Sequence, residues 1–216
     1  MRKLCLAVTI FGLLAAAGVA GEEPATYKPD DEGFIRNWLV VGPIALGEKA
    51  STHEEDSQKE FFNKEYWTGQ KKAMPKNGDK VTVDGKEFAW KAAASEEAIV
   101  DLNKVYDGTN TQNSLVLGVV YLIADADLEG LKLKTGSDDS SMWTLNDKEL
   151  KRFYAGRAAE KDQDTIEGVT LKKGVNVLRM AVINGDGEYG ICARFTDKDD
   201  KAVAGFKVSL TPPAAE

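Results

Sequence analysis

The sequence predicts an all-β fold, a sandwich of two antiparallel sheets with one short helical segment near residues 59–67. Two observations support this prediction. Short stretches in which apolar and polar residues alternate recur along the chain, and turn-forming residues separate them roughly every eight to twelve positions. No internal repeat of fixed period and no linker rich in Pro, Gly or Ser divides the chain. We therefore expect one sandwich domain over residues 34–211.

The N-terminus predicts export. Arg2 and Lys3 precede an uncharged apolar run over residues 4–19, and small residues follow it. This is the layout of a signal peptide, which we place at residues 1–21, although a retained membrane anchor is the alternative. The protein would then be secreted or periplasmic. Residues 22–33 are polar and contain two prolines, so we expect a flexible leader. Residues 212–216 form a tail.

Composition excludes several classes of function. Removal of the signal takes two of the 28 basic residues and none of the 35 acidic ones, so the net charge falls from −7 to −9. A chain this acidic is a poor partner for nucleic acid or an anionic membrane. Cys192 would be the only remaining cysteine, which leaves no intramolecular disulfide, and we expect it to be buried in a strand. With His53 as the only histidine, most histidine-based catalytic sites are excluded.

The predicted elements follow from local patterns. Residues 34–42 form the first strand, which Pro43 is expected to end. An acidic loop follows over residues 47–60, and the helical segment overlaps its end. Asp84-Gly85 has the chemistry of a tight hairpin turn. Further strands are predicted at residues 99–102, 115–123, 166–171, 175–183, 189–195 and 203–210. The second of these is apolar throughout, which predicts burial on both faces.

Several motifs, in order, resemble a known class of domain. These are Gly136-Ser-Asp-Asp139 with Met142–Leu150, Trp38-Leu-Val-Val-Gly-Pro-Ile44, Leu171-Lys-Lys-Gly-Val-Asn176 and Tyr189–Asp197. Together they resemble the galactose-binding-like jelly-roll domains of secreted bacterial proteins. These include non-catalytic carbohydrate-binding modules and, more loosely, the protective-antigen-type sugar-binding domain. The resemblance spans residues 34–210 and implies a jelly-roll sandwich. One departure is Asp147, which stands where the family usually has glycine.

Asp138 and Asp139 are the first candidate site. In the sugar-binding domains that this chain resembles, adjacent aspartates at a strand entry can coordinate calcium, which prefers hard oxygen ligands. The alternative is structural, because aspartate side chains also hold turns through hydrogen bonds to the backbone. We favour the structural interpretation, and we expect no other cofactor.

Two further pairs are candidates for ligand binding. Tyr66 and Trp67 lie in the irregular segment after the first strand, where they would stack on a sugar or form part of a flap that covers the sandwich. Arg157 and Asp164 bracket a polar loop. An ion pair that fixes this loop is the simpler interpretation, and binding of a sugar edge is the other. The tryptophans in alternating strands, Trp38, Trp90 and Trp143, are expected in the core.

These patterns predict an exported, non-catalytic binding module for a glycan or a cell-envelope polymer. The alternative is a secreted structural or protein-interaction domain whose partner is another exported protein. We expect no enzyme, because no combination of nucleophile and base stands out. Paired carboxylates are abundant, but the separation that defines a glycosidase pair cannot be read from the sequence.

Overall fold

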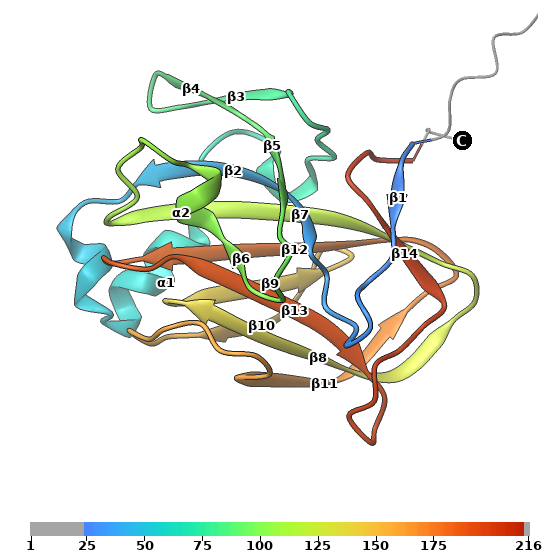
Figure 1. Cartoon of the computed structure of the whole chain (residues 1–216). Helices are drawn as coiled ribbons and strands as arrows, with labels where there is room; N and C mark the ends of the chain where they lie inside the picture. The colour runs from blue at the N-terminus through green and yellow to red at the C-terminus, as the bar shows by residue number, and fades with distance from the viewer. Residues whose placement is uncertain (1–23, 214–216) are drawn as a thin grey trace, which may run out of the picture.

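The computed structural model describes residues 24–213. They form a β-sandwich of two antiparallel sheets, neither of which closes into a barrel (Figure 1). The predicted all-β sandwich is therefore confirmed. The predicted signal peptide, residues 1–21, lies outside the described part of the chain. Within residues 24–213, no helix is long and apolar enough to cross a membrane.

Strands account for most of the elements. The strands are β1 (Thr26–Tyr27), β2 (Asn37–Ala45), β3 (Lys80–Val83), β4 (Lys86–Ala89), β5 (Lys91–Ala94), β6 (Val100–Asp101), β7 (Ser114–Ala124), β8 (Leu128–Asp138), β9 (Ser141–Leu145), β10 (Lys148–Phe153), β11 (Asp164–Leu171), β12 (Gly174–Asn184), β13 (Gly190–Thr196) and β14 (Phe206–Ser209). The helices are α1 (Glu55–Asn63) and α2 (Leu102–Val105), with 3-10 turns η1 (Glu48–Thr52) and η2 (Gln70–Lys72).

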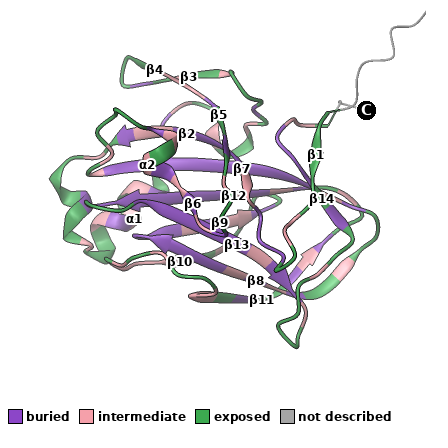
Figure 2. Cartoon of the chain, in the orientation of Figure 1, coloured by how far each residue is buried: buried purple, intermediate pink, exposed green. Residues whose placement is uncertain are grey.

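The large sheet has eight strands centred on β7 and β12. β7 pairs with β12 along its whole length, and its other edge pairs first with β2 and then with β14. β9 and β10 continue the sheet beyond β12. The small sheet has the order β11-β8-β13-β6, and β3 and β4 form a separate hairpin (Figure 1). As predicted for residues 115–123, β7 is buried on both faces (Figure 2).

The core lies between the two sheets. Trp38 and Trp143 are fully buried there, with their rings edge to face and their centroids 6.0 Å apart. Each indole N–H is satisfied, by the carbonyl oxygen of Ile35 and the hydroxyl of Ser141 respectively. Buried Trp needs such partners because an unpaired polar group is costly in an apolar core. The predicted burial of these tryptophans, and of Cys192, is confirmed.

Pro43 does not end the first strand as predicted. β2 continues to Ala45, and its register against β7 shifts between Val41 and Ile44. The intervening Gly42 and Pro43 stand outside the ladder as a bulge. A proline lacks the N–H that a ladder needs, and a bulge removes that need without ending the strand. The proline therefore marks an irregularity inside the strand.

The predicted flexible leader, residues 22–33, is instead fastened to the domain where the structure describes it. Thr26 and Tyr27 pair with β14 as the short strand β1. The Asp30 carboxylate accepts hydrogen bonds from the backbone N–H of Phe34 and from the guanidinium of Arg36. These bonds, together with Arg36, lower the pKa of Asp30 against the opposing effect of burial. Polar composition therefore concealed an edge strand and an anchored turn.

The helical segment is shifted from its predicted position. α1 occupies Glu55–Asn63, and residues 64–67 follow it without helical structure, whereas the prediction was residues 59–67. The predicted acidic loop, residues 47–60, therefore holds η1 and most of α1. Gln58 explains part of the difference, because its buried side-chain amide donates to the carbonyl oxygen of Ala50 and ties α1 to η1. The predicted strand at residues 99–102 is short, since α2 begins at Leu102.

Candidate functional site

Two rows of side chains cross the outer face of the large sheet. The first row consists of Val119, Arg179, Thr144 and Glu149. The second row consists of Leu117, Ala181, Met142 and Arg152. Directly opposed residues in paired antiparallel strands point to the same face, as do residues two apart along one strand. A register shift in β10 brings Glu149 and Arg152, which are three apart in sequence, onto this face.

These rows form the floor of a groove with a cavity volume of about 190 Å³. One wall comes from Phe62 in α1, from Trp67 in the segment between α1 and η2, and from Trp90. The rings of the two tryptophans meet edge to face, with centroids 6.3 Å apart. Tyr121 secures the segment that follows η2, because its hydroxyl donates to the carbonyl oxygen of Pro75 at 2.7 Å. The groove thus combines an aromatic wall with a floor that is apolar on one side and charged on the other.

Each arginine in the groove is held by a carboxylate. Arg179 donates to Asp147 at 3.0 Å and also to the carbonyl oxygen of Ala73 at 3.0 Å. Arg152 donates to both carboxylate oxygens of Glu149, at 3.0 and 2.7 Å, and to Asn63 at 2.8 Å. These bonds fix both guanidinium groups in position and neutralise their charge.

The two arginines differ in how the protein affects their charge. The hydrogen bond that Arg152 donates to Glu149 raises the pKa of Arg152, whereas burial lowers the pKa of Arg179. Both start from a value far above neutral, so both side chains remain cationic at physiological pH.

The structure separates the predicted pair Tyr66 and Trp67. Tyr66 is buried, and its hydroxyl donates to the carbonyl oxygen of Phe61 at 3.1 Å. Trp67 is only partly buried and lines the groove. Of the two alternatives for this pair, the surroundings of Tyr66 agree with the covering flap, because Tyr66 is buried and helps to fix the segment that carries Trp67 over the sheet.

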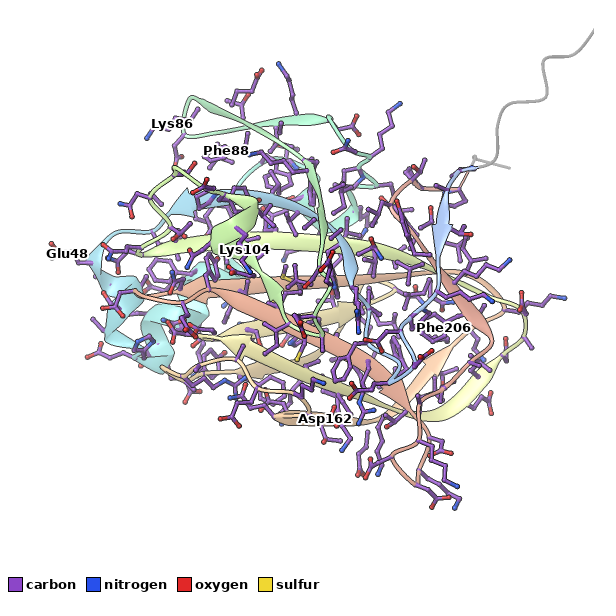
Figure 3. All side chains as sticks on the ribbon, viewed as in Figure 1. Glu48, Lys86, Phe88, Lys104, Asp162 and Phe206 are labelled. Carbon is purple, nitrogen blue, oxygen red and sulfur yellow. The ribbon has the colours of Figure 1, made fainter. Side chains whose placement is uncertain are left out.

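The other four predicted residues come together on the small sheet. Asp138 ends β8 and Asp139 follows it directly, and the ion pair between Arg157 and Asp164 is present beside them. Arg157 also donates to the backbone oxygen and the hydroxyl of Ser137, at 3.2 and 2.9 Å. The predicted pair thus fixes residues 155–163 across the outer face of the small sheet. Figure 3 labels Asp162, within this segment, on the side of the sandwich opposite Lys86 in the β3–β4 hairpin.

The two neighbouring aspartates have different surroundings. Asp139 accepts backbone N–H groups from Arg157 and from Gly185, both at 2.8 Å, and so joins β8 to two loops. These are long-range bonds, not the bonds to nearby residues that hold a local turn. Asp138 accepts no hydrogen bond through its carboxylate from residues 24–213 and lines a separate pocket. No group of three or more His, Cys, Asp or Glu in that part of the chain is arranged to hold a metal ion.

The sequence matches no protein-family model, and a comparison with curated proteins found no match. Among solved structures, a beta-glucosidase from Kluyveromyces marxianus in complex with glucose is similar, with 19% identity and a TM-score of 0.38. The selenomethionine-labelled form of that enzyme gives 18% identity and a TM-score of 0.36. The matches cover 59% and 56% of this chain but 16% of each enzyme chain. Likeness at this level carries no argument about function.

The groove could not be found by inspecting single motifs. Arg179 follows Val175 and Val177 at intervals of two residues, which places the three side chains on one face of the strand. Its neighbours Thr144 and Glu149 come from other strands, and only the pairing register brings them beside it. A charged residue within an apolar strand was the one signal available from the sequence.

Proposed function

We propose that the chain is an exported, non-catalytic module that binds an uncharged glycan in the groove of the large sheet. The observation that carries the proposal is the arrangement of fixed polar groups over an apolar floor, beside the ring of Trp67. Sugar rings present C–H faces that suit aromatic and apolar surfaces, and hydroxyl groups that suit oriented donors and acceptors. Binding sites for small molecules share this combination of apolar lining and a few placed polar groups.

The charge balance of the groove favours a neutral ligand. Arg152 is neutralised by Glu149, and Arg179 by Asp147, so the four groups contribute no net charge. Lys71 adds one positive charge at the exposed rim. A site for an anionic polymer would instead keep unmatched basic groups at its centre. Because the carboxylates in the groove are held by arginines, we assign them to positioning and not to catalysis.

The resemblance to galactose-binding-like jelly-roll modules also supports this proposal. The motifs around residues 136–150 and 171–176 carry that resemblance. They lie in strands and turns of an all-β sandwich, the fold class that the resemblance implies. A fold hosts many functions, so the groove and not the fold carries the assignment.

A glycan array followed by calorimetry tests the proposal. We expect the protein to bind a neutral oligosaccharide, and Trp67→Ala to weaken that binding at least tenfold. Tyr27→Ala is the matched control, since Tyr27 is an exposed aromatic residue on β1 that does not line the groove. An array with no bound neutral glycan, or binding that Trp67→Ala leaves unchanged, contradicts the proposal and favours a structural or protein-interaction domain.

A further inference from the structure

A second cavity, of about 220 Å³, lies over the outer face of the small sheet at the end of β8. Its lining includes three carboxylates and three aliphatic or backbone surfaces. They belong to Asp101, Asp138, Glu188, Ile99, Ala159 and Gly190. The cavity is separate from the groove, with which it shares no lining residue.

The register of β8 directs Asp138 into this cavity. Thr135 and Ser137 are fully buried on the inner face, so Gly136 and Asp138 point outward. Two glycines let the flanking segments close around the carboxylate. A Cβ atom at Gly136 would meet the Glu160 carbonyl oxygen at 1.9 Å, and one at Gly190 would meet Ile99 Cγ2 at 3.0 Å.

Asp138 is buried without a partner. Its exposed fraction is 5%, and among residues 24–213 no side chain or backbone group donates a hydrogen bond to its carboxylate. The nearby cationic side chains have other partners. Arg157 pairs with Asp164, and Lys104 Nζ lies 3.5 Å from a carboxylate oxygen of Asp101. The carboxylate oxygens of Asp138 are open to the cavity, so a ligand that enters the cavity can reach a carboxylate that the described residues leave without a donor.

The surrounding charges are also negative. Burial is the main cause that raises the pKa of Asp138 to about 7. The carboxylates of Asp139, Glu188 and Asp186 raise it further, and Arg157 acts in the opposite direction. In mildly alkaline solution Asp138 is ionised, and the cavity then favours a cation.

We propose that this cavity binds a primary ammonium group on a short aliphatic stem, with Asp138 as its ion-pair acceptor and Glu188 as a second acceptor. An ammonium group offers three donors to the carboxylates, while Ile99 and Ala159 supply an apolar surface for the stem. The inference does not depend on the role proposed for the groove.

An organic cation fits this cavity better than a metal ion. Calcium takes six to eight oxygen ligands, and both oxygens of Asp139 already accept backbone N–H groups. Within the described residues, no cluster of three or more acidic, His or Cys side chains has metal-binding geometry. A single ion-pair acceptor with a second carboxylate nearby is sufficient for an ammonium group.

An NMR titration of the full chain with butylammonium chloride at about pH 8, at constant chloride concentration, tests this proposal. We expect saturable shifts at the amides of Ile99, Ala159 and Gly190, and none with 1-butanol. Asp138→Asn should weaken binding at least tenfold, because it removes the charged acceptor. Asp199→Asn is the control, since Asp199 lies in an exposed turn outside the cavity.

Three results would overturn the proposal: shifts that sodium chloride alone reproduces, binding that Asp138→Asn leaves intact, or saturation by calcium in place of butylammonium. Glu188→Gln provides a second variant if Asp138→Asn does not fold, and we expect it to weaken binding about threefold. Ammonium groups occur on free amines and on lysine side chains. Tighter binding of a blocked lysine than of butylammonium would assign the lysine side chain, and the reverse order would assign a free amine.

Discussion

The groove on the large sheet and the cavity on the small sheet treat charge in opposite ways. In the groove, Arg152 and Arg179 each donate to a carboxylate. Arg152 also donates to the side chain of Asn63, and Arg179 to the carbonyl oxygen of Ala73, and these bonds fix the two guanidinium groups. In the cavity, Asp138 is buried and has no donor among residues 24–213. Charges that are paired within the protein shape a surface for a neutral ligand, whereas a buried charge without a partner favours a ligand of opposite charge.

The same contrast occurs between adjacent residues. Asp139 accepts two backbone N–H groups, and its neighbour Asp138 accepts none. The two residues have the same chemistry and nearly the same burial, with exposed fractions of 6% and 5%. The difference arises from what surrounds each carboxylate, because one meets the backbone of two loops and the other lines a cavity. One carboxylate is therefore structural, and the other is available to a ligand.

The largest expected effect is on Asp139. Asp139→Ala leaves the N–H groups of Arg157 and Gly185 without their acceptor, and we expect the free energy of unfolding to fall by about 3 kcal/mol. Urea denaturation measures this loss.

The loss at Asp139 should be equal in calcium and in chelator. A wild-type protein that melts higher as calcium rises, while Asp139→Ala does not, would instead show that the aspartates hold a metal ion.

For Asp138, by contrast, we expect a substitution to raise the free energy of unfolding. Burial raises its pKa to about 7 in the folded protein, from 3.8 for an aspartate free in solution, so the folded state binds the proton more tightly. Stability therefore falls as pH rises from about 4 through 7, and the full loss is present above pH 7. Asp138→Asn removes this loss. A rise in pKa from 3.8 to about 7 corresponds to roughly 4 kcal/mol, but solvent reaches the carboxylate through the cavity and screens it, so we expect the free energy of unfolding to rise by roughly 2 kcal/mol at pH 8.

Near pH 4, where Asp138 is protonated in the folded state, Asp138→Asn should change the free energy of unfolding little or not at all. Urea denaturation at the two pH values, with Asp199→Asn as the control, measures the difference. An equal effect at both values would mean that the carboxylate does not carry its charge in the folded protein at pH 8.

A smaller loss is expected for the aromatic wall of the groove. Trp67→Ala removes a partly buried indole and its edge-to-face contact with Trp90, which should cost about 1.5 kcal/mol. The same substitution should weaken glycan binding at least tenfold, as measured by calorimetry. Tyr66→Phe separates the two effects, because it loses only the hydrogen bond to Phe61 and should leave the affinity within about twofold.

The sequence was sufficient to predict the sandwich and several of its turns. Asp84-Gly85 adopts the positive φ angles of a tight hairpin turn, as its chemistry indicates. Asn146-Asp147 adopts them too, although Asp147 stands where the family that the chain resembles usually has glycine. The burial of Trp143 followed from the two-residue period of β9, in which Trp143 shares a face with Ser141 and Leu145. These features depend on neighbours in the chain, so local patterns are enough to predict them.

The candidate sites depend on contacts between distant segments, which limited their prediction. Arg157 and Asp164 are close in sequence, and their ion pair was predictable. The two donors of Asp139 come from residues 157 and 185, and the groove combines four strands with a flap. No pattern along one strand specifies such a register. The strand β1 was missed for the same reason, because its pairing with β14 joins the two ends of the described chain.

The smallest expected effect on stability is at the turn between β9 and β10. Asp147 has a φ of 64°, a conformation that glycine adopts without strain, and it pairs with Arg179 through a side chain that is 56% exposed. Asp147→Gly relieves the backbone and removes a largely exposed ion pair, and each contribution is worth less than about 1 kcal/mol. We therefore expect the free energy of unfolding to change by less than about 0.5 kcal/mol. Affinity for the glycan should still fall severalfold, because Arg179 loses the carboxylate that orients it over the groove. Calorimetry and urea denaturation on the same variant separate the two quantities. An unchanged affinity would show that the ion pair does not position Arg179 for a ligand, and that the groove does not use its paired charges in the way we propose.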